Sequence, residues 1–493
     1  MNNSFTTAMR NESVWSNTLN GATCLSSTLN KCLDLFGRAG ALRFATVTEK
    51  QTLFYEAFEE NSDIAMKLLF YIRDIRGGYG ERDTFTDMLK WVANAHPESV
   101  KKNLWAILEY GRAKDLYSLI GTKSEDAMWQ FMKDQFELDI KNMQANKSIS
   151  LLAKWIATPD ASSTTTAALG KKTAIKLGYN FKNMREYKKI LRTLRKYLDV
   201  PEVKMAAGKW SEIEYSKLSS QCLIKHRNAF KRHDLNRYQE YLDSVAAGNS
   251  KMNTATMTPC DIIREVRHHY TEDLDTMWSN LEDYCDGNAL VMCDTSGSMT
   301  CNTTHQMKPI DVAIALSMYF AERNKGELKN MFITFETNPH IVEIRGSNLL
   351  NKVNNIYNAP WGGSTDLGLA FDKLLNICIK GNVKAEDMPK AIIIISDMQI
   401  NCVRGIDTDH NLTFYQIMSR KYEKAGYTLP QVVFWNVNSA RATFHASATQ
   451  NGASLVSGYS PAIFKTVMQN IGRTPLDLMM DVVNSERYAS ITA

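Results

Sequence analysis

The chain has 493 residues and a net charge of +5, with 44% hydrophobic and 23% charged residues, values that are ordinary for a globular protein of two or three domains. No apolar run approaches the roughly 18 residues of a membrane span, and the start Met-Asn-Asn-Ser-Phe lacks the apolar core of a signal peptide, which argues against a membrane or secreted protein. The nine scattered cysteines form no Cys-x-x-Cys pair, so we expect reduced thiols in a cytoplasmic protein, or in the host cytoplasm if the chain is viral.

Helical patterns fill the chain from about residue 27 to residue 285, after an N-terminal extension of residues 1–26. Apolar residues recur three and four positions apart in Ile64–Ile75, Arg82–Ala95, Ser99–Tyr110, Glu125–Lys141 and Ile149–Ala157. Glycine and proline lie between these segments as helix breakers. The pattern predicts an α-helical, HEAT-like repeat domain, although the sequence has no clean period.

One link in this helical part, Arg73–Asp83, is both charged and rich in glycine. Its glycines could only turn the chain, or the link could be a functional loop. The sequence leaves both interpretations open.

Positive charge is concentrated in residues 141–237, which carry 21 Lys and Arg against 7 Asp and Glu. On a helix, several of these cations would return to one face, with Tyr187 and Tyr197 beside them. A basic stripe with aromatic rings is typical of proteins that bind single-stranded RNA, whereas the alternative is a solvated helix face. The candidate nucleic-acid-binding residues are Lys182, Arg185, Lys188, Lys189, Arg192, Arg195, Lys196, Arg227, Lys231 and Arg232.

The segment Ala289–Met299 reads Ala-Leu-Val-Met-Cys-Asp-Thr-Ser-Gly-Ser-Met. Its five leading apolar residues are typical of a buried strand. Where that strand ends, Asp294, Ser296 and Ser298 place a carboxylate and two hydroxyls at alternate positions in a tight loop. Such groups bind hard cations, so the pattern predicts a Mg²⁺ or Mn²⁺ site. The alternative is that one of these residues only caps the following helix.

Strands and helices alternate after this motif. Strands are predicted at 331–335, 340–344, 391–396, 431–437 and 453–456, and helices at 308–324, 367–379, 411–425 and 461–469. The alternation predicts a doubly wound, Rossmann-like α/β domain over residues 286–482, followed by a C-terminal tail of residues 483–493. With the strand order 3-2-1-4-5-6, the strands that end at Cys293 and Ser396 are neighbours at the switch point, where such sheets bind ligands.

The metal motif is followed in order by Gly362-Gly363-Ser364-Thr365-Asp366 and by an apolar strand that precedes Asp397. This arrangement resembles the metal-ion-dependent adhesion site (MIDAS) of von Willebrand factor A (vWA) domains. The resemblance implies that Thr365 and Asp397 complete the metal shell of Asp294, Ser296 and Ser298. We expect one coordination position to stay open for an Asp or Glu of a partner protein.

A helical half followed by a vWA domain with this motif resembles the TROVE family, the Ro-type RNA-binding proteins. Stretches such as Met66–Asp83, Ser150–Pro159 and Val433–Val437 look closer still to an uncharacterised family of plant, bacterial and viral proteins with the same organisation. The Ro-type proteins bind small structured RNAs through a ring of helical repeats. The resemblance therefore implies RNA binding by residues 27–285, which form a shorter helical part than theirs.

Enzyme signatures are missing from the sequence. It has no Gly-x-x-x-x-Gly-Lys-Ser/Thr phosphate loop and no His-Glu-x-x-His pattern, and Ser296 does not lie in a Gly-x-Ser-x-Gly turn. The titratable groups near the metal motif are His305, in a polar loop, and Asp366, which we expect to cap the helix at Leu367. The sequence favours a binding protein that is not an enzyme.

Two functions remain. In the first, the basic helical domain binds RNA while the metal face of the vWA domain recruits a protein. In the second, the chain is purely a protein-interaction adaptor, for instance a partner of a MoxR-type AAA+ ATPase, as many intracellular vWA proteins are.

Overall fold

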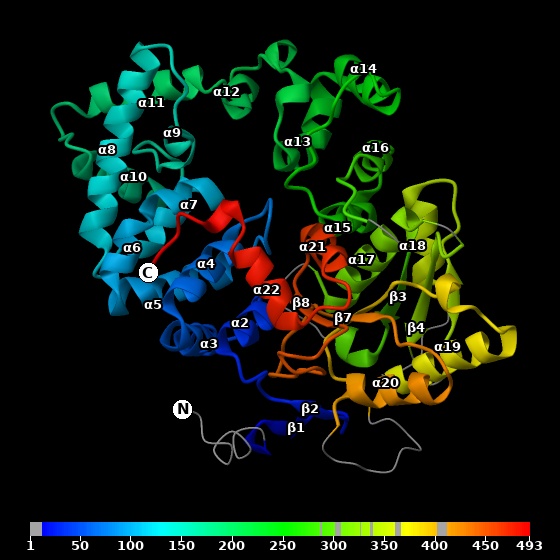
Figure 1. Cartoon of the computed structure of the whole chain (residues 1–493). Coiled ribbons are helices and arrows are strands. Elements are labelled where there is room, and N and C mark those ends of the chain that lie inside the picture. The colour runs from blue at the N-terminus through cyan, green and yellow to red at the C-terminus, as the bar shows by residue number, and fades with distance from the viewer. Residues whose placement is uncertain are drawn as a thin grey trace.

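The computed structural model describes residues 12–285, 288–300, 307–325, 327–335, 339–359, 366–401 and 412–493. Helices fill the N-terminal half of the chain, and a six-stranded sheet lies in the C-terminal half (Figure 1). The predicted fold class, a helical domain followed by a doubly wound α/β domain, is confirmed. Among the described helices, none is both long enough and apolar enough to cross a bilayer.

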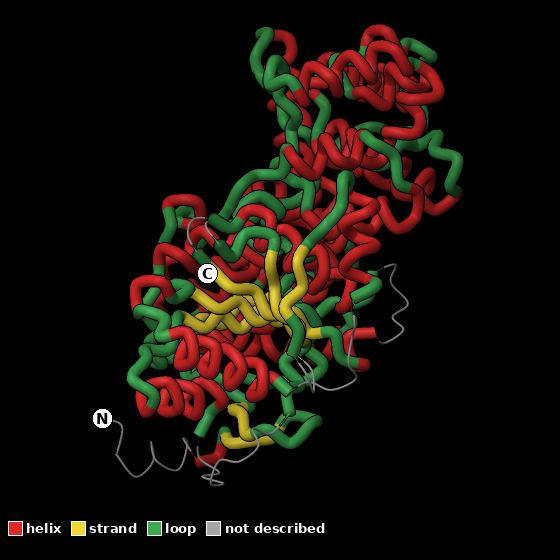
Figure 2. The backbone as a smooth tube through the Cα atoms, turned by 90° about the vertical axis from the view of Figure 1, so that its right-hand side faces the viewer, coloured by secondary structure: helices red, strands yellow, loops and turns green. Residues whose placement is uncertain are grey.

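The helical half forms an arc whose two ends rest on the α/β domain (Figure 1). Its helices are α2 (Lys31–Ala39), α3 (Val47–Glu60), α4 (Ser62–Arg73), α5 (Arg82–Ala95), α6 (Pro97–Lys102), α7 (Leu104–Tyr110), α8 (Glu125–Gln144), α9 (Leu152–Trp155), α10 (Thr164–Lys176), α11 (Met184–Tyr197), α12 (Pro201–Ala206), α13 (Ser220–His233), α14 (Leu235–Ala246), α15 (Pro259–His269) and α16 (Asp273–Ser279), with 3-10 turns η1 (Ala113–Leu119), η2 (Trp210–Glu212) and η3 (Tyr215–Lys217). Figure 2 shows the arc rising beyond the sheet.

Two predicted helices differ from the observed ones. The segment Ser99–Tyr110 is broken at Asn103, whose side-chain amide donates to the carbonyls of Ser99 and Thr492 and so competes with the helical hydrogen bonds. The segment predicted at 149–157 is helical only over α9, because the amide and hydroxyl of Ser150 are both bonded to Asp139.

The sheet has the strand order β5-β4-β3-β6-β7-β8, which is the predicted order 3-2-1-4-5-6. Its strands are β3 (Ala289–Asp294), β4 (Met331–Phe335), β5 (Ile341–Glu343), β6 (Ala391–Ser396), β7 (Gln431–Asn436) and β8 (Ala453–Ser457). All neighbours are parallel except β4 and β5, which pair antiparallel. Cys293 pairs with Ile395, so β3 and β6 end side by side at one edge.

Helices cover both faces of the sheet, as successive side chains on β7 demonstrate. The domain's helices are α17 (Pro309–Arg323), α18 (Leu349–Tyr357), α19 (Leu367–Gly381), α20 (Phe414–Lys424), α21 (Phe464–Gln469) and α22 (Pro475–Val483), with 3-10 turns η4 (Gly297–Thr300), η5 (Ala385–Asp387), η6 (Pro461–Ile463) and η7 (Glu486–Tyr488). The Trp435 ring lies 5.4 Å from that of Phe320 on α17, whereas the Phe434 ring lies 6.4 Å from that of Phe414 on α20. The seven described cysteines are buried free thiols.

The two ends of the chain each pack on the domain at the other end of the sequence. The hairpin β1 (Trp15–Asn17) and β2 (Thr23–Leu25) reaches the α/β domain, where Leu25 bridges to Phe444, and α2 packs against β8. The C-terminal tail returns to the helical arc, where the Arg487 guanidinium pairs with the Asp74 carboxylate. The described part of the predicted extension, residues 12–26, and the predicted tail therefore join the two domains.

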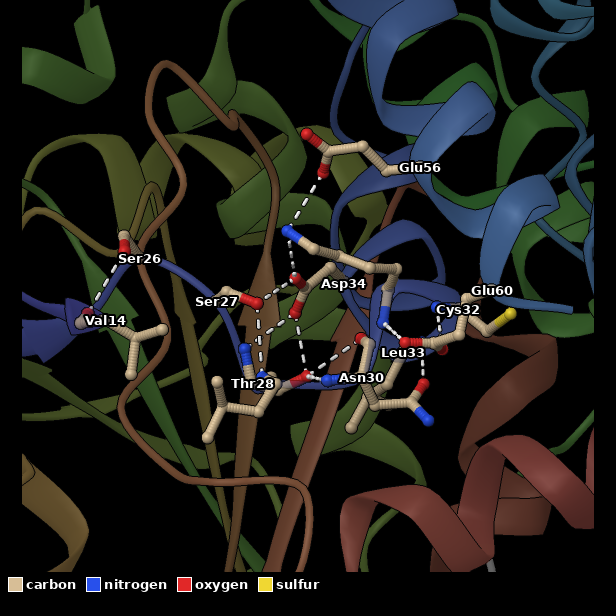
Figure 3. Close-up of polar contacts among 12 residues, drawn as sticks. Val14, Ser26, Ser27, Thr28, Asn30, Cys32, Leu33, Asp34, Glu56 and Glu60 are labelled. Atoms are coloured by element: carbon tan, nitrogen blue, oxygen red, sulfur yellow. Dashed lines mark hydrogen bonds and ion pairs between the residues drawn. The ribbon is translucent and has the colours of Figure 1, made fainter. Parts of the chain in front are cut away.

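Figure 3 shows how the start of α2 is anchored beside the hairpin. The backbone amide and the hydroxyl of Thr28 each donate to Asp34 Oδ1 at 2.7 Å, and Asn30 caps the helix by accepting from the Leu33 amide at 2.7 Å. Lys31 Nζ lies 3.0 Å from Glu56 Oε2 on α3. These contacts fix the direction in which the chain leaves the α/β domain for the arc.

Candidate metal centre

The predicted metal ligands that the structure describes gather where β3 and β6 end. Asp294, the last residue of β3, is 0% exposed, and Asp397, directly after β6, is 3% exposed. Ser296 is also buried, whereas Ser298 on η4 is exposed, and the two hydroxyl oxygens are 3.1 Å apart. The two carboxylates of the site are therefore buried, and the Ser298 hydroxyl lies on the side that faces solvent.

Hydrogen bonds hold both carboxylates in place. Asp294 Oδ2 accepts from the Ser396 hydroxyl at 2.6 Å, and Asp294 Oδ1 accepts from the Ser296 amide at 2.9 Å. Asp397 Oδ1 accepts from the Gln399 amide at 3.0 Å. Both carboxylates are thus oriented by neighbours before any ligand binds.

The negative charges of the Asp294 and Asp397 carboxylates favour the binding of a cation. Burial, followed by the negative charge of Asp397, raises the pKa of Asp294 to about 7, and burial raises the pKa of Asp397. The described groups that shift these two pKa values include no cationic side chain. Buried carboxylates are normally paired or bound to a metal, and carboxylates with hydroxyls are the oxygen ligands of Mg²⁺ and Mn²⁺. The residues present therefore fit a hard divalent cation.

Two expected members of this neighbourhood, Thr365 and His305, lie outside the described residues. Asp366 lies within them, and its carboxylate accepts from the Leu369 amide at 3.1 Å. The prediction that Asp366 caps the helix at Leu367 is confirmed.

The loop after Asp397 is braced by residues that sequence reasoning missed. Met398 has a φ of +65°, in the left-handed region, and its carbonyl lies 3.0 Å from Nε2 of the buried His445. From the N-terminal hairpin, the Thr18 hydroxyl donates to the Ile400 carbonyl at 2.7 Å, and the Leu19 amide donates to Gln399 Oε1 at 2.9 Å. No local sequence signal indicates that residues 18–20 lie beside residues 399–401, which are distant in the chain.

The ten basic candidates do not form one equivalent surface. Lys182, Arg185, Lys189, Arg192, Lys196 and Arg232 are exposed. The other four are engaged within the protein: Lys188 pairs with Asp160, Arg195 bonds the carbonyls of Ala153 and Ile156, Arg227 pairs with Glu265, and Lys231 pairs with Asp273. Tyr187 is buried, and Tyr197 is exposed. We define the basic stripe as the exposed cations of α11: Arg185, Lys189, Arg192 and Lys196.

Two family models match the chain, one in its N-terminal part and one in its C-terminal part. The family described as "Domain of unknown function (DUF7788)" matches residues 288–487. An uncharacterized protein of Acanthamoeba polyphaga mimivirus is 27% identical over 509 aligned positions, which cover 94% of this chain and 86% of the relative. The crystal structure of the Deinococcus radiodurans Ro (RSR) protein aligns with a TM-score of 0.49 and 13% identity over 93% of this chain and 99% of that chain. The family described as "Domain of unknown function (DUF2828)" matches residues 18–134 and 127–288, more than half of the sequence, so the chain belongs to that family.

Proposed function

We propose that this chain is a binding protein whose metal centre holds Mg²⁺, or Mn²⁺, and through it an acidic side chain of a partner protein. The observation that carries the proposal is the pair of buried carboxylates, Asp294 and Asp397, with hydroxyls as their neighbours at the switch point of the sheet. Asp294, Ser296 and Ser298, with Asp397 and Thr365, would hold the ion. The exposed Ser298 marks the side from which a partner's Asp or Glu would approach.

The surroundings of the centre favour recognition over catalysis. A bound cation becomes catalytic when a nucleophile or general base is positioned beside it. The described neighbours of the two carboxylates are hydroxyls and backbone amides. His445, which contacts the Asp397 loop from the segment between β7 and β8, is buried, bonds the Met398 carbonyl, and has its pKa lowered by burial to about 4.

Manganese provides a direct test. Titration of the purified chain with Mn²⁺, followed by electron paramagnetic resonance, should give one site that Asp294→Ala weakens by roughly 100-fold. The matched control is Asp387→Ala, because Asp387 is exposed on η5 near the opposite, amino-terminal end of β6. If one coordination position is open, the bound Mn²⁺ should also raise the relaxation rate of water protons, and acetate should lower it. Equal Mn²⁺ binding by wild type and Asp294→Ala would refute the assignment.

A second candidate function is RNA binding by the basic stripe. Its four cations follow one another at intervals of four, three and four residues, so they lie on one side of α11, opposite the buried Tyr187, Leu191 and Leu194. None of the four takes part in an ion pair with a described residue, which leaves their charges available to phosphates.

The two candidate functions are separated by the nucleic-acid content of the purified protein. RNA binding predicts a raised ratio of absorbance at 260 nm to that at 280 nm, which RNase treatment returns to the value for protein alone. A protein-only ratio before RNase, together with no binding of added RNA, would leave the adaptor function alone, for instance with an AAA+ ATPase as the partner.

A further inference from the structure

A pocket of about 540 Å³ lies in the helical arc, away from the metal centre. Its volume is in the range of sites that bind small organic ligands. We define the arginine–tryptophan pocket by six of its lining residues: Arg76, Trp105, Arg112, Phe131, Leu151 and Trp155. They come from the glycine-rich link, from α7, α8 and α9, and from the chain that enters η1 and α9.

The pocket offers both cationic and aromatic groups. Arg76 and Arg112 take part in no ion pair with a described residue, and the Arg112 guanidinium carbon lies 5.0 Å from the centre of the Trp155 ring. The Trp105 side chain is 38% exposed and Leu151 is 55% exposed, so apolar groups stand uncovered at the rim. Exposed aromatic surface beside unpaired guanidinium groups is suited to a ligand that is both planar and anionic.

Buried ion pairs fix this arrangement. The Asp115 carboxylate, which is 0% exposed, pairs with Arg73 at 2.7 Å and with Arg82 at 2.8 Å, and so holds the two ends of the glycine-rich link against η1. Two guanidinium groups share this one carboxylate, so positive charge remains in excess beside Arg112. Burial and the charge of Arg73 lower the pKa of Arg112.

Two positions of the glycine-rich link need glycine because the backbone there packs closely or has a positive φ. A Cβ atom on Gly78 would lie 2.0 Å from the Tyr71 carbonyl oxygen, and Gly80 has a φ of +71°. These two positions let residues 74–81 fold back tightly on α4 and place Arg76 at the pocket. Close packing therefore accounts for the glycines of this link, and a functional role for Arg76 is part of the proposal below.

We propose that the arginine–tryptophan pocket binds one nucleotide of a single-stranded RNA, with the base against the tryptophan rings and the phosphate against Arg76 and Arg112. Bases stack on aromatic rings regardless of sequence, and guanidinium groups pair with phosphate. The proposal rests on RNA binding by the helical arc and adds a site to the basic stripe. The helix that carries the basic stripe, α11, packs against α9, which carries Trp155: Arg195 of α11 donates to the Ala153 and Ile156 carbonyls.

The test uses the full chain and a fluorescein-labelled oligouridine of ten nucleotides. Irradiation at 254 nm should crosslink the RNA to peptides that contain Trp105 or Trp155, and not to the peptide of Trp210. Trp105→Ala and Arg76→Glu should each weaken binding by about 5- to 100-fold. Lys90→Glu, an exposed charge reversal on α5 outside the pocket, should leave binding and crosslinking unchanged. Both test positions are exposed, so the variants should fold.

The outcomes distinguish this proposal from the proposed RNA binding itself. RNA that binds without crosslinks in the pocket, and with equal affinity for wild type, Trp105→Ala and Arg76→Glu, would overturn the pocket assignment and leave the basic stripe standing. Failure of the chain to bind the oligouridine at all would overturn both. Binding of adenosine monophosphate that Arg76→Glu abolishes, with no competition by oligouridine, would assign the pocket to free nucleotides and also overturn the RNA proposal.

Discussion

The metal centre and the basic stripe differ in how the fold uses their residues. In the metal centre, Asp294 and Ser396 are 102 positions apart in sequence, yet their side chains meet at 2.6 Å because two parallel strands end side by side. In the basic stripe, all four cations lie on one helix, and their side chains point into solvent. The first site is assembled by topology and buried, whereas the second is contiguous and exposed.

This difference determines what a substitution should do in each place. In the metal centre, burial amplifies each charge, so one side chain should change both metal affinity and stability. On the basic stripe, solvent screens each charge, so single changes should be small and several are needed for a clear effect.

The largest effect should come from Asp294→Asn, which removes one charge and keeps the shape. Because burial and Asp397 raise the folded-state pKa of Asp294 from 3.8 to about 7, the ionised carboxylate costs stability that accumulates as the pH rises from about 4 to 7. At pH 8 without divalent metal, the variant should therefore be more stable than wild type by at least ~1 kcal/mol.

Saturating Mg²⁺ should reverse that order. A ligand at 100 times its Kd stabilises the folded state by about 2.7 kcal/mol, and only wild type should gain this. The measurement is urea unfolding at pH 8 with EDTA or with Mg²⁺. An Asn variant less stable than wild type in EDTA would show that the carboxylate pair does not repel in the metal-free protein.

The next effect concerns the basic stripe. Replacing Arg185, Lys189, Arg192 and Lys196 by Glu should lower RNA affinity and flatten its dependence on salt. On a single strand, the logarithmic slope should fall by about 0.7 for each phosphate that the variant no longer neutralises. The measurement is fluorescence anisotropy with oligouridine at several salt concentrations.

A charge-matched control is available in the α/β domain. Lys329, Lys380, Lys390 and Lys424 are exposed there, and replacing them by Glu changes the net charge equally. Equal losses of affinity in the two quadruple variants would mean that overall charge, and not the basic stripe, drives RNA binding.

The metal centre and the basic stripe also differ in how well the sequence predicts them. The strand order and the meeting of Asp294 with Asp397 were predictable, because apolar strands ending in oxygen-bearing residues obey rules of sheet topology. The basic stripe was predictable only in part. Helical periodicity placed Lys188 and Arg195 with the other cations, but Asp160 and the carbonyls of α9, from a separate segment, engage them.

Contacts between distant segments were not predictable from local pattern. Nothing around Thr18 indicates that its hydroxyl reaches the Ile400 carbonyl, and nothing in the C-terminal tail indicates that Arg487 pairs with Asp74. Such contacts depend on how the two domains dock, and helix and strand periods carry no information about docking.

A smaller effect should come from the hairpin that braces the Asp397 loop. Thr18→Val removes the donor to the Ile400 carbonyl while keeping the side-chain volume close to that of threonine. Mutation of a group that orients a metal ligand from outside the coordination shell typically lowers metal affinity by 10- to 100-fold. Thr18 contacts the loop that follows the ligand Asp397 and not Asp397 itself, so its effect should be smaller. We expect a loss of Mn²⁺ affinity of about 3- to 10-fold by titration, with unchanged secondary structure. Unchanged affinity would mean that residues 397–401 hold their conformation without the hairpin.

The last effect is a pH dependence at His445. Its ring is fully buried, Nδ1 has no described partner, and burial lowers its pKa from 6.5 to about 4. Between those values the unfolded chain binds a proton that the folded protein does not, so stability should fall as the pH drops from about 6.5 to 4, by at most ~1.4 kcal/mol per pH unit. His445→Gln retains a donor for the Met398 carbonyl but does not titrate.

Acidic side chains titrate in the same range, so the difference between wild type and the Gln variant isolates the histidine. The free energy of unfolding of wild type should decline relative to that of His445→Gln from pH 6.5 to 4 and run parallel to it above pH 7. Parallel curves over the whole range would show that the ring gains its proton in the folded state. The Asp397 loop would then have to accommodate an imidazolium beside the Met398 carbonyl, which a buried site without a counter-charge should resist.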